Sequence, residues 1–244
     1  MLDNKEGTKV PEVDFKVQES NQWMSWGYKQ LFAGKRVILF SLPGAYTPTC
    51  SSTHLPRYNE LAELFAKENI SDIYCLSVND TFVMNAWKET QGAKNITFLP
   101  DGNGEFSSAM GMLVDKENIG FGKRSWRYSM VVNDGVIEKM FIEADIPGDP
   151  FDVSDADTML NYLAPSAKEA PKVSLFTKPG CAHCVRAKQL LEDHNLSYEE
   201  IELGKNGLSY SSLSAVTGKN TTPQVYIDGV NIGGADELDK WLKD

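Results

Sequence analysis

Two of the four cysteines stand as a Cys-x-x-Cys pair, which is the arrangement with the clearest chemistry in this chain. Cys181 and Cys184 follow the turn Lys178-Pro179-Gly180 and stand at the predicted start of a helix. A thiol at a helix N-terminus lies near the positive end of the helix dipole and near unpaired backbone N–H groups, which stabilise the thiolate. Lys178 adds a positive charge. The spacing therefore predicts a redox-active dithiol.

The same pair has two other interpretations, half of a zinc site or two thiols packed in a core. A structural zinc site needs four ligands. The sequence has neither a second Cys-x-x-Cys pair nor two histidines at the spacing that zinc sites use. The dithiol is therefore the favoured interpretation, and no metal site is predicted.

Cys50 ends the loop PGAYTPTC (residues 43–50), between a strand-like apolar run at 36–42 and residues with helical spacing. A strand-to-helix turn again places a thiol where a helix N-terminus can stabilise its thiolate. Thr47 can bring its hydroxyl beside the sulfur, and Pro43 and Pro48 stiffen the loop. Cys50 is therefore a candidate nucleophile. The alternative is a half-buried structural cysteine.

Two neighbouring residues favour structural roles. Cys75 lies in the apolar run 72–78, where a buried cysteine packs as a small hydrophobe. His54 follows Cys50 by four residues and would share its face on a continuous helix. Pro56 predicts a break there, so a structural polar contact is the favoured role of His54.

Composition excludes several classes of protein. The 244 residues are 41% hydrophobic and 24% charged, as in ordinary globular domains. A formal net charge of -10 argues against a nucleic-acid surface. The longest apolar runs are strand-sized, far short of the roughly 20 residues that cross a bilayer, so no membrane partner is expected. The first residues lack the apolar core of a signal peptide, and a cytoplasmic location is the default expectation.

A boundary is predicted between residues 163 and 171, where two prolines stand among small and charged residues. It divides the chain into a domain at 1–164, a linker at 165–171 and a domain at 172–244. Each domain alternates strand-like and helix-like runs, which indicates an α/β fold. The predicted strands are 36–42, 72–78, 129–132, 136–142, 172–176, 198–201, 224–227 and 230–232. The predicted helices are 55–65, 80–91, 154–163, 181–194, 209–216 and 235–242.

The second domain resembles glutaredoxins over its whole length. The resemblance is carried by KPGCAHC (178–184), TTPQVYI (221–227) and GGAD (233–236). It implies that Cys181 is the nucleophile and that Cys184 can close an internal disulfide with it. Ala182 and His183 depart from the usual Cys-Pro-Tyr-Cys or Cys-Pro-Phe-Cys, which leaves the reduction potential open.

The glutaredoxin resemblance also implies a glutathione site. Pro223 is expected to follow a cis peptide bond, and Thr222 is expected to bind glutathione through its backbone. Ala235 and Asp236 are expected to hold the γ-glutamyl end, with Lys178 near the glycine carboxylate. The glutathione-binding residues implied in this way are Lys178, His183, Thr222, Pro223, Gly234, Ala235 and Asp236.

Residues 8–163 resemble type-5 peroxiredoxins. The likeness rests on Pro-x-x-x-Thr-x-x-Cys at 43–50 and its continuation to 56, on SVND (77–80) and DGNG (101–104), and on RSWRYS (124–129). It implies that Cys50 attacks peroxides, aided by Pro43, Thr47 and an arginine. The family pattern selects Arg127. Arg124 is expected on the opposite, solvated face of the same strand.

The whole chain resembles bacterial hybrid proteins that fuse a type-5 peroxiredoxin to a glutaredoxin. This implies an α/β chain of two thioredoxin-like domains joined by a short Pro/Ala linker. It also implies a glutathione-dependent peroxidase that reduces hydrogen peroxide and organic hydroperoxides. Residues 148–154 lack the resolving cysteine of animal relatives, so the first domain has no evident internal resolving thiol. The resemblance to the hybrid proteins implies glutathione as the reducing co-substrate, with no bound cofactor.

The analogy also predicts a homo-oligomer, a dimer or tetramer with contacts between peroxiredoxin and glutaredoxin domains. Two other functions stay open at this point. One is a general disulfide reductase whose first domain recruits substrates, and the other is a redox sensor or holdase that uses oxidation of Cys50 as a signal.

Overall fold

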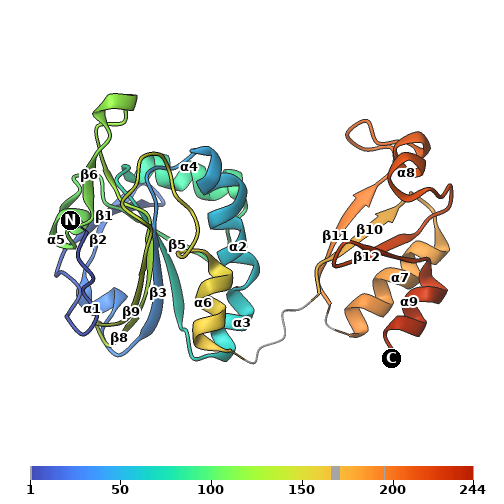
Figure 1. Ribbon diagram of the computed structural model, residues 1–244, viewed down its shortest axis with the longest axis horizontal. Helices are drawn as coiled ribbons and strands as arrows, with labels where there is room; N and C mark the ends of the chain where they lie inside the picture. Colours follow the sequence, from blue (N-terminus) through green and yellow to red (C-terminus); the bar gives the residue numbers. More distant parts are fainter. Residues whose placement is uncertain (1, 166–170, 195, 244) are drawn as a thin grey trace. The chain divides into compact units, whose positions relative to one another are not determined.

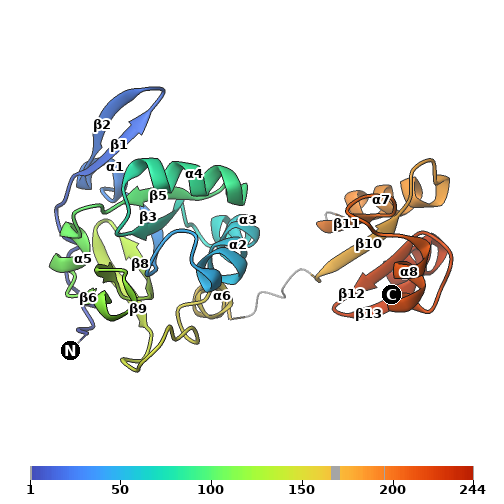
Figure 2. The ribbon, with the colours of Figure 1, turned by 90° about the horizontal axis from the view of Figure 1, so that it is seen from above.

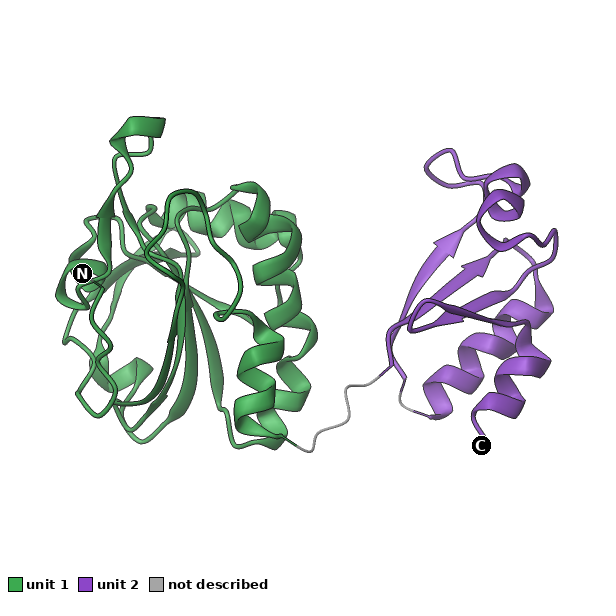
Figure 3. Cartoon of the chain, viewed as in Figure 1, with its two compact units in different colours: residues 1–167 green, residues 168–244 purple. Residues whose placement is uncertain are grey.

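In the computed structural model, which describes residues 2–165, 171–194 and 196–243, the chain divides into unit 1 (residues 1–167) and unit 2 (residues 168–244), coloured separately in Figure 3. The predicted domain limits at 164 and 172 lie near this division. Residues 166–170 of the predicted linker lie outside the described residues. Each unit is a mixed α/β fold with its own core (Figure 1).

Unit 1 begins with a hairpin and ends with a helix. Its elements in chain order are β1 (Phe15–Glu19), β2 (Gln22–Trp26), α1 (Tyr28–Leu31), β3 (Arg36–Ser41), the π-helical turn η1 (Cys50–His54), α2 (Leu55–Glu60), α3 (Ala62–Lys67), β4 (Asp72–Ser77), α4 (Thr81–Gln91), β5 (Thr97–Pro100), α5 (Glu105–Ala109), β6 (Leu113–Asp115), the 3₁₀ turn η2 (Glu117–Ile119), β7 (Lys123–Ser125), β8 (Tyr128–Asn133), β9 (Val136–Ile142) and α6 (Ala156–Leu163).

The central sheet of unit 1 has the strand order β5-β4-β3-β8-β9. Strands β3, β4 and β5 run parallel, and β8 and β9 are antiparallel to them. Successive side chains of β3 serve opposite faces, as the pleat requires. Ile38 and Phe40 pack with the helix-side core, whereas Val37 and Leu39 pack with the core on the other face. A strand that is buried on both faces has apolar residues at successive positions, which explains the continuous apolar run of β3 in the sequence.

Different elements cover the two faces. Helices α2, α3, α4 and α6 cover one face, and α1, α5 and the β1–β2 hairpin lie on the other (Figure 1). The hairpin turns at Ser20 and Asn21, which both have positive φ, and it projects from unit 1 in Figure 2. Sequence analysis missed this hairpin and strands β5, β6 and β7, because they are short and carry little periodic apolar pattern.

Several local predictions for unit 1 are confirmed. Asp80 caps α4 by accepting hydrogen bonds from the backbone N–H groups of Phe82 and Val83. Asp134 and Gly135 form the turn between β8 and β9 with positive φ at both residues, as Asx-Gly turns do. The predicted break at Pro56 is wrong. Proline is tolerated in the first turn of a helix, and the chain stays helical from η1 into α2.

Unit 2 follows the predicted order of elements, β10 (Val173–Thr177), α7 (Ala182–Asp193), β11 (Tyr198–Glu202), α8 (Tyr210–Thr217), β12 (Gln224–Ile227), β13 (Val230–Gly233) and α9 (Ala235–Trp241). The sheet order is β11-β10-β12-β13, with β10 and β11 parallel. Helices α7 and α9 supply Leu191 and Leu238 to the core on one face, and α8 supplies Leu213 to the other. The fold class predicted from the sequence is confirmed for both units.

No helix among the described residues is long and apolar enough to cross a membrane.

The β8–β9 turn gives a test of this packing. An added Cβ at Gly135 would collide with the ring of Tyr28, whose hydroxyl donates to the carbonyl of Asp134 at 3.2 Å. Gly135→Ala should lower the free energy of unfolding by about 2 kcal/mol or more, from a strained φ plus a displaced ring. Gly122→Ala is the control, since Gly122 has a similar φ with open space around it. Urea unfolding should rank Gly135→Ala as the more destabilised variant, and equal losses would contradict this account.

Candidate active site

The Cys50 thiol lies at the start of η1, directly after the loop that follows β3. It is fully buried. Asn79 ties this loop to the end of β4, because its Oδ1 accepts from the backbone N–H of Ala45 at 3.0 Å and from Ser77 Oγ at 2.7 Å. Trp87 of α4 donates its indole N–H to Ser51 Oγ at 3.1 Å. The chain on both sides of Cys50 is therefore tied to neighbouring elements.

Arg127 brings a positive charge to this thiol. Its Nη1 donates to Cys50 Sγ at 3.5 Å, and the side chain is only 1% exposed. Burial by itself would lower the pKa of Arg127, but hydrogen bonding to Asp149 and the charges of Cys50 and Asp149 outweigh it, so the pKa is raised. A permanently charged donor therefore lies within hydrogen-bond distance of the sulfur.

His54 holds the same guanidinium on its other side. Nη1 of Arg127 donates to His54 Nδ1 at 3.0 Å, so the ring proton resides on Nε2 and is donated to the carbonyl of Ser154 at 3.2 Å. Burial, and secondly the charge of Arg127, lower the pKa of His54 to about 3. His54 is thus a neutral acceptor. The favoured structural contact is present, and its partner is the arginine beside Cys50.

Asp149 supplies the counter-charge. Both of its carboxylate oxygens accept from Arg127 Nη2, at 2.5 and 2.6 Å. The ring of Phe151 lies 5.4 Å from the guanidinium carbon and 4.9 Å from the ring of His54. Sequence analysis did not identify either residue. A buried arginine needs a carboxylate partner, but the sequence does not indicate which of the 34 acidic residues provides it.

Thr47 and Pro43 lie in the loop that carries Cys50. The Thr47 hydroxyl donates to the carbonyl of Gly44 at 2.9 Å, which braces the loop internally. Pro43 is buried at the end of β3. The structure thus places both residues in the Cys50 loop, and the hydroxyl has its partner inside that loop.

The prediction that Arg124 occupies a solvated face of the same strand as Arg127 is wrong. Arg124 lies in β7 and Arg127 immediately precedes β8, so the two do not share a strand. Arg124 is half-buried, and it donates to the carbonyls of Val78 at 2.9 Å and Phe121 at 2.8 Å. One strand ends and the next begins between the two arginines. The prediction assumed that side chains alternate between the two faces of a single strand, and this assumption does not hold here.

Cys75 is fully buried in β4. Burial raises the pKa of its thiol well above the ordinary value, with a further contribution from Cys50. It therefore stays a neutral, apolar thiol, in agreement with the structural role expected for it.

The Cys181–Cys184 pair is a disulfide, with a Cα–Cα distance of 5.2 Å. Cys181 caps α7, and its sulfur accepts from the backbone N–H of Cys184 at 3.1 Å. Thr222 Oγ1 lies 3.7 Å from the same sulfur. Cys181 is 8% exposed and Cys184 only 2%, so Cys181 is the more accessible sulfur.

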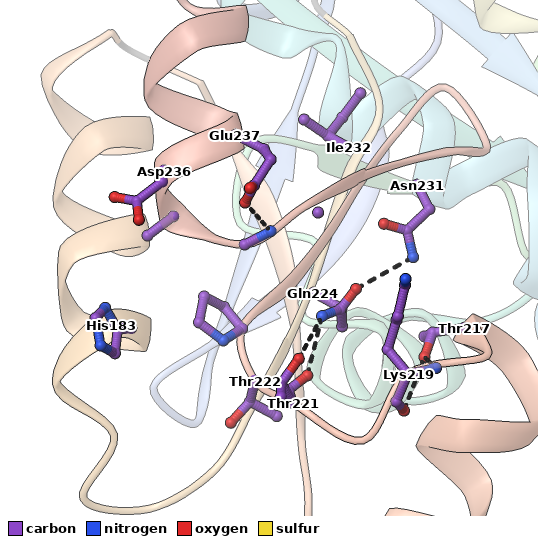
Figure 4. A pocket seen from close by; sticks show the side chains of 14 residues that line it. His183, Thr217, Lys219, Thr221, Thr222, Gln224, Asn231, Ile232, Asp236 and Glu237 are labelled. Atoms are coloured by element: carbon purple, nitrogen blue, oxygen red, sulfur yellow. Dashed lines mark hydrogen bonds between the residues drawn. The ribbon is translucent and has the colours of Figure 1, made fainter.

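A groove of about 620 Å³ adjoins this end of unit 2 (Figure 4). Six of the residues predicted to bind glutathione line it, namely His183, Thr222, Pro223, Gly234, Ala235 and Asp236. The Thr222–Pro223 peptide bond is cis. Lys178 is not among the lining residues, and its ammonium group lies 5.8 Å from the ring of Tyr210.

Polar residues that sequence analysis did not single out line another part of the groove. Gln224 donates to the carbonyl of Thr221 at 3.0 Å and accepts from Asn231 at 3.3 Å, and Lys219 lies beside them in Figure 4. Asp236 pairs with Arg186 of α7 at 2.5 Å, an exposed ion pair that contributes little stability. The groove thus combines a cation, amides and carboxylates.

Among the described residues, no group of three or more His, Cys, Asp and Glu side chains is arranged to hold a metal ion.

Comparisons with known proteins agree with this architecture. The Redoxin family model matches residues 5–160, and the Glutaredoxin family model matches residues 173–232. A hybrid peroxiredoxin of Haemophilus influenzae is 59% identical over 241 residues, covering 99% of this chain and all of that protein. A Synechocystis peroxiredoxin is 56% identical over 68% of this chain and 94% of its own length. The crystal structure of reduced Prx3 from Vibrio vulnificus in complex with H2O2 is 39% identical with a TM-score of 0.61, covering 65% of this chain and 98% of that one.

The chain therefore belongs to the redoxin family. More specifically, it is a peroxiredoxin, a thiol peroxidase, that carries a glutaredoxin domain in the same chain.

The buried neutral state of His54 predicts acid sensitivity. Its pKa is about 3 in the folded chain, against an ordinary 6.5, so below pH 6.5 the unfolded chain binds a proton that the folded chain does not. Stability from this residue is complete above pH 6.5 and falls by about 1.4 kcal/mol per pH unit below it.

The measurement is urea unfolding across this pH range, followed by tryptophan fluorescence, since four of the five tryptophans lie in unit 1. His54→Gln keeps an acceptor and a donor but does not titrate. Its stability should depend less on pH than that of the unchanged chain between pH 6.5 and about 5. Identical slopes would show that His54 is protonated in the folded state.

Proposed function

We propose that this chain is a glutathione-dependent peroxidase that reduces hydrogen peroxide and organic hydroperoxides at Cys50, with its own glutaredoxin domain as the regenerating unit. The observation that carries the proposal is Arg127, a buried permanent cation that donates to Cys50 Sγ at 3.5 Å. This arrangement supports a thiolate and aims a charged donor at an oxygen approaching the sulfur.

The first step consumes the peroxide. The thiolate of Cys50 attacks the terminal oxygen, so an S–O bond forms while the O–O bond breaks, and the departing oxygen takes a proton to leave as water or an alcohol. Sulfur is oxidised to the sulfenic acid and the peroxide is reduced. Arg127, the backbone N–H of Cys50 and the Thr47 loop are proposed to stabilise negative charge on the two oxygens.

Glutathione then reduces the sulfenic acid. Its thiol condenses with Cys50–SOH to a mixed disulfide, and water leaves. Cys50 is fully buried, so a tripeptide reaches it only when η1 moves aside. Cys181 is proposed to attack the mixed disulfide and release the Cys50 thiolate, and a second glutathione clears Cys181, with or without Cys184. Tethering the two sites in one chain raises the effective concentration of one active site near the other.

The groove of unit 2 supports glutathione as the reductant. Six of the seven residues that the glutaredoxin resemblance assigns to glutathione line it, beside the Cys181 sulfur. We propose that Lys219 and Gln224 join them as polar contacts. The cycle needs a compartment rich in reduced glutathione, which fits the cytoplasmic location expected from the sequence. By analogy with the family, we also propose that the chain forms a homo-oligomer.

Substitution of the first thiol tests the peroxidase step. Cys50→Ser should abolish consumption of peroxide and leave intact the reduction of a small glutathione mixed disulfide by unit 2. Cys75→Ser is the matched control, because Cys75 is buried in the core with a raised pKa, and it should retain peroxide turnover. The measurement is NADPH oxidation coupled through glutathione and glutathione reductase. Turnover above a few per cent in Cys50→Ser would place the peroxidatic thiol elsewhere.

A second substitution pair tests the regenerating route. Cys181 is the more exposed sulfur and stands at the helix N-terminus, so a monothiol route needs Cys181 alone. At limiting glutathione, Cys181→Ser should lose nearly all peroxidase turnover and Cys184→Ser should keep much of it. Steady-state rates decide the matter. If both variants are equally inactive, the enzyme works through the internal Cys181–Cys184 disulfide instead.

The same assay distinguishes the rival functions. A general disulfide reductase would reduce mixed disulfides without glutathione-supported peroxide turnover, and a sensor would oxidise Cys50 once without a catalytic cycle.

A further inference from the structure

The carboxylate of Glu143, just after β9, is buried and receives four hydrogen bonds from one short segment. Its Oε1 accepts from the backbone N–H groups of Asp152, Val153 and Ser154 at 3.0, 3.0 and 2.8 Å, and from Ser154 Oγ at 2.7 Å. Glu143 is only 2% exposed. A buried carboxylate persists only with such compensation, so this segment and Glu143 hold each other in place.

The segment that Glu143 holds reaches Arg127 by two routes. Upstream, Asp149 takes the two hydrogen bonds of Arg127 Nη2. Downstream, the carbonyl of Ser154 accepts from His54 Nε2, which makes the other ring nitrogen the acceptor for Arg127 Nη1. Both terminal nitrogens of the guanidinium therefore depend on one stretch of chain.

The backbone of Glu143 also binds the chain at Arg127 directly. Its N–H donates to the carbonyl of Arg127 at 3.2 Å, and its carbonyl accepts from the indole N–H of Trp126 at 3.0 Å. One residue thus fixes the main chain that carries Arg127 and, through its side chain, the segment that orients the guanidinium. The side chain of an arginine is long and flexible. Hydrogen bonds to a segment that is itself held in place restrict where its guanidinium lies.

We propose that Glu143 is a positioning residue for peroxide reduction, which acts through Asp149 and Ser154 to hold Arg127 at the Cys50 sulfur. The inference rests on the proposed role of Arg127. Glu143 itself is not assigned contact with the peroxide. Because stabilisation of the transition state requires donors that are already in place, displacement of Arg127 slows the reaction even though its charge remains.

The test compares single variants with their combination in the full reduced chain. Asp149→Asn should slow oxidation of Cys50 by hydrogen peroxide about tenfold, as expected for a weakened charge-assisted hydrogen bond, and Glu143→Gln about fivefold. Because Glu143 acts partly through Asp149 and partly through Ser154, the double variant should be slowed by more than about tenfold but by clearly less than the about fiftyfold that independent residues would give. Stopped-flow fluorescence with one equivalent of peroxide gives the rates.

Two controls separate positioning from loss of structure. Asp145→Asn makes the same chemical change at an exposed residue of the same connection and should leave the rate unchanged. Alkylation of Cys50 by iodoacetamide is measured at alkaline pH on the plateau of its rate, so that the amount of thiolate does not limit it. This reaction involves no peroxide oxygens for Arg127 to orient, so its plateau rate should change much less than the peroxide rate in each variant. Should Glu143→Gln fail to fold, Ser154→Ala removes one hydrogen bond to Oε1 and takes its place.

Three outcomes would each overturn the proposal. The double variant is slowed by the product of the two single effects, or Glu143→Gln leaves the rate of oxidation by peroxide unchanged, or a variant slows oxidation by peroxide and alkylation by iodoacetamide equally. Arg127→Gln is measured alongside them. If it fails to slow peroxide, the proposed role of Arg127 is wrong. If it slows peroxide while the Asp149 and Glu143 variants do not, only the positioning role is overturned.

Discussion

A buried guanidinium is the constraint on which unit 1 depends. Arg127 carries a permanent charge into a core where it is 1% exposed, and such a charge persists only if it is paired and hydrogen-bonded. Cys50, His54 and Asp149 meet this need at the two terminal nitrogens of the guanidinium. The partners that stabilise the buried cation also hold it beside the Cys50 sulfur. The same hydrogen-bond network therefore serves the stability of unit 1 and its chemistry.

The fold brings this network together from three parts of the chain. The loop after β3 carries the thiol, the residue before β8 carries the guanidinium, and the connection between β9 and α6 carries the counter-charge. Strands β3 and β8 are neighbours in the sheet, which brings the first two together. The connection is held by Glu143, whose carboxylate organises residues 152–154.

Unit 2 achieves its chemistry by more local means. Cys181 owes its environment to the helix that it caps and to Thr222 across the fold. The groove beside it is lined mainly by polar residues. Unit 1 instead encloses its thiol, since Cys50 is fully buried. The two units thus divide the proposed cycle between a closed and an open site.

The sequence by itself determined the fold class, the places of the two candidate thiol sites and six of the residues that line the groove in unit 2. These features depend on short stretches whose pattern is local, such as the apolar run at β3 and the Cys-x-x-Cys pair. Tertiary structure alone decided that Asp149 pairs with Arg127, that Glu143 holds residues 152–154, and that Arg124 belongs to another strand. A carboxylate 22 residues from its arginine carries no local signal, because the pairing arises only when the sheet and its connections close.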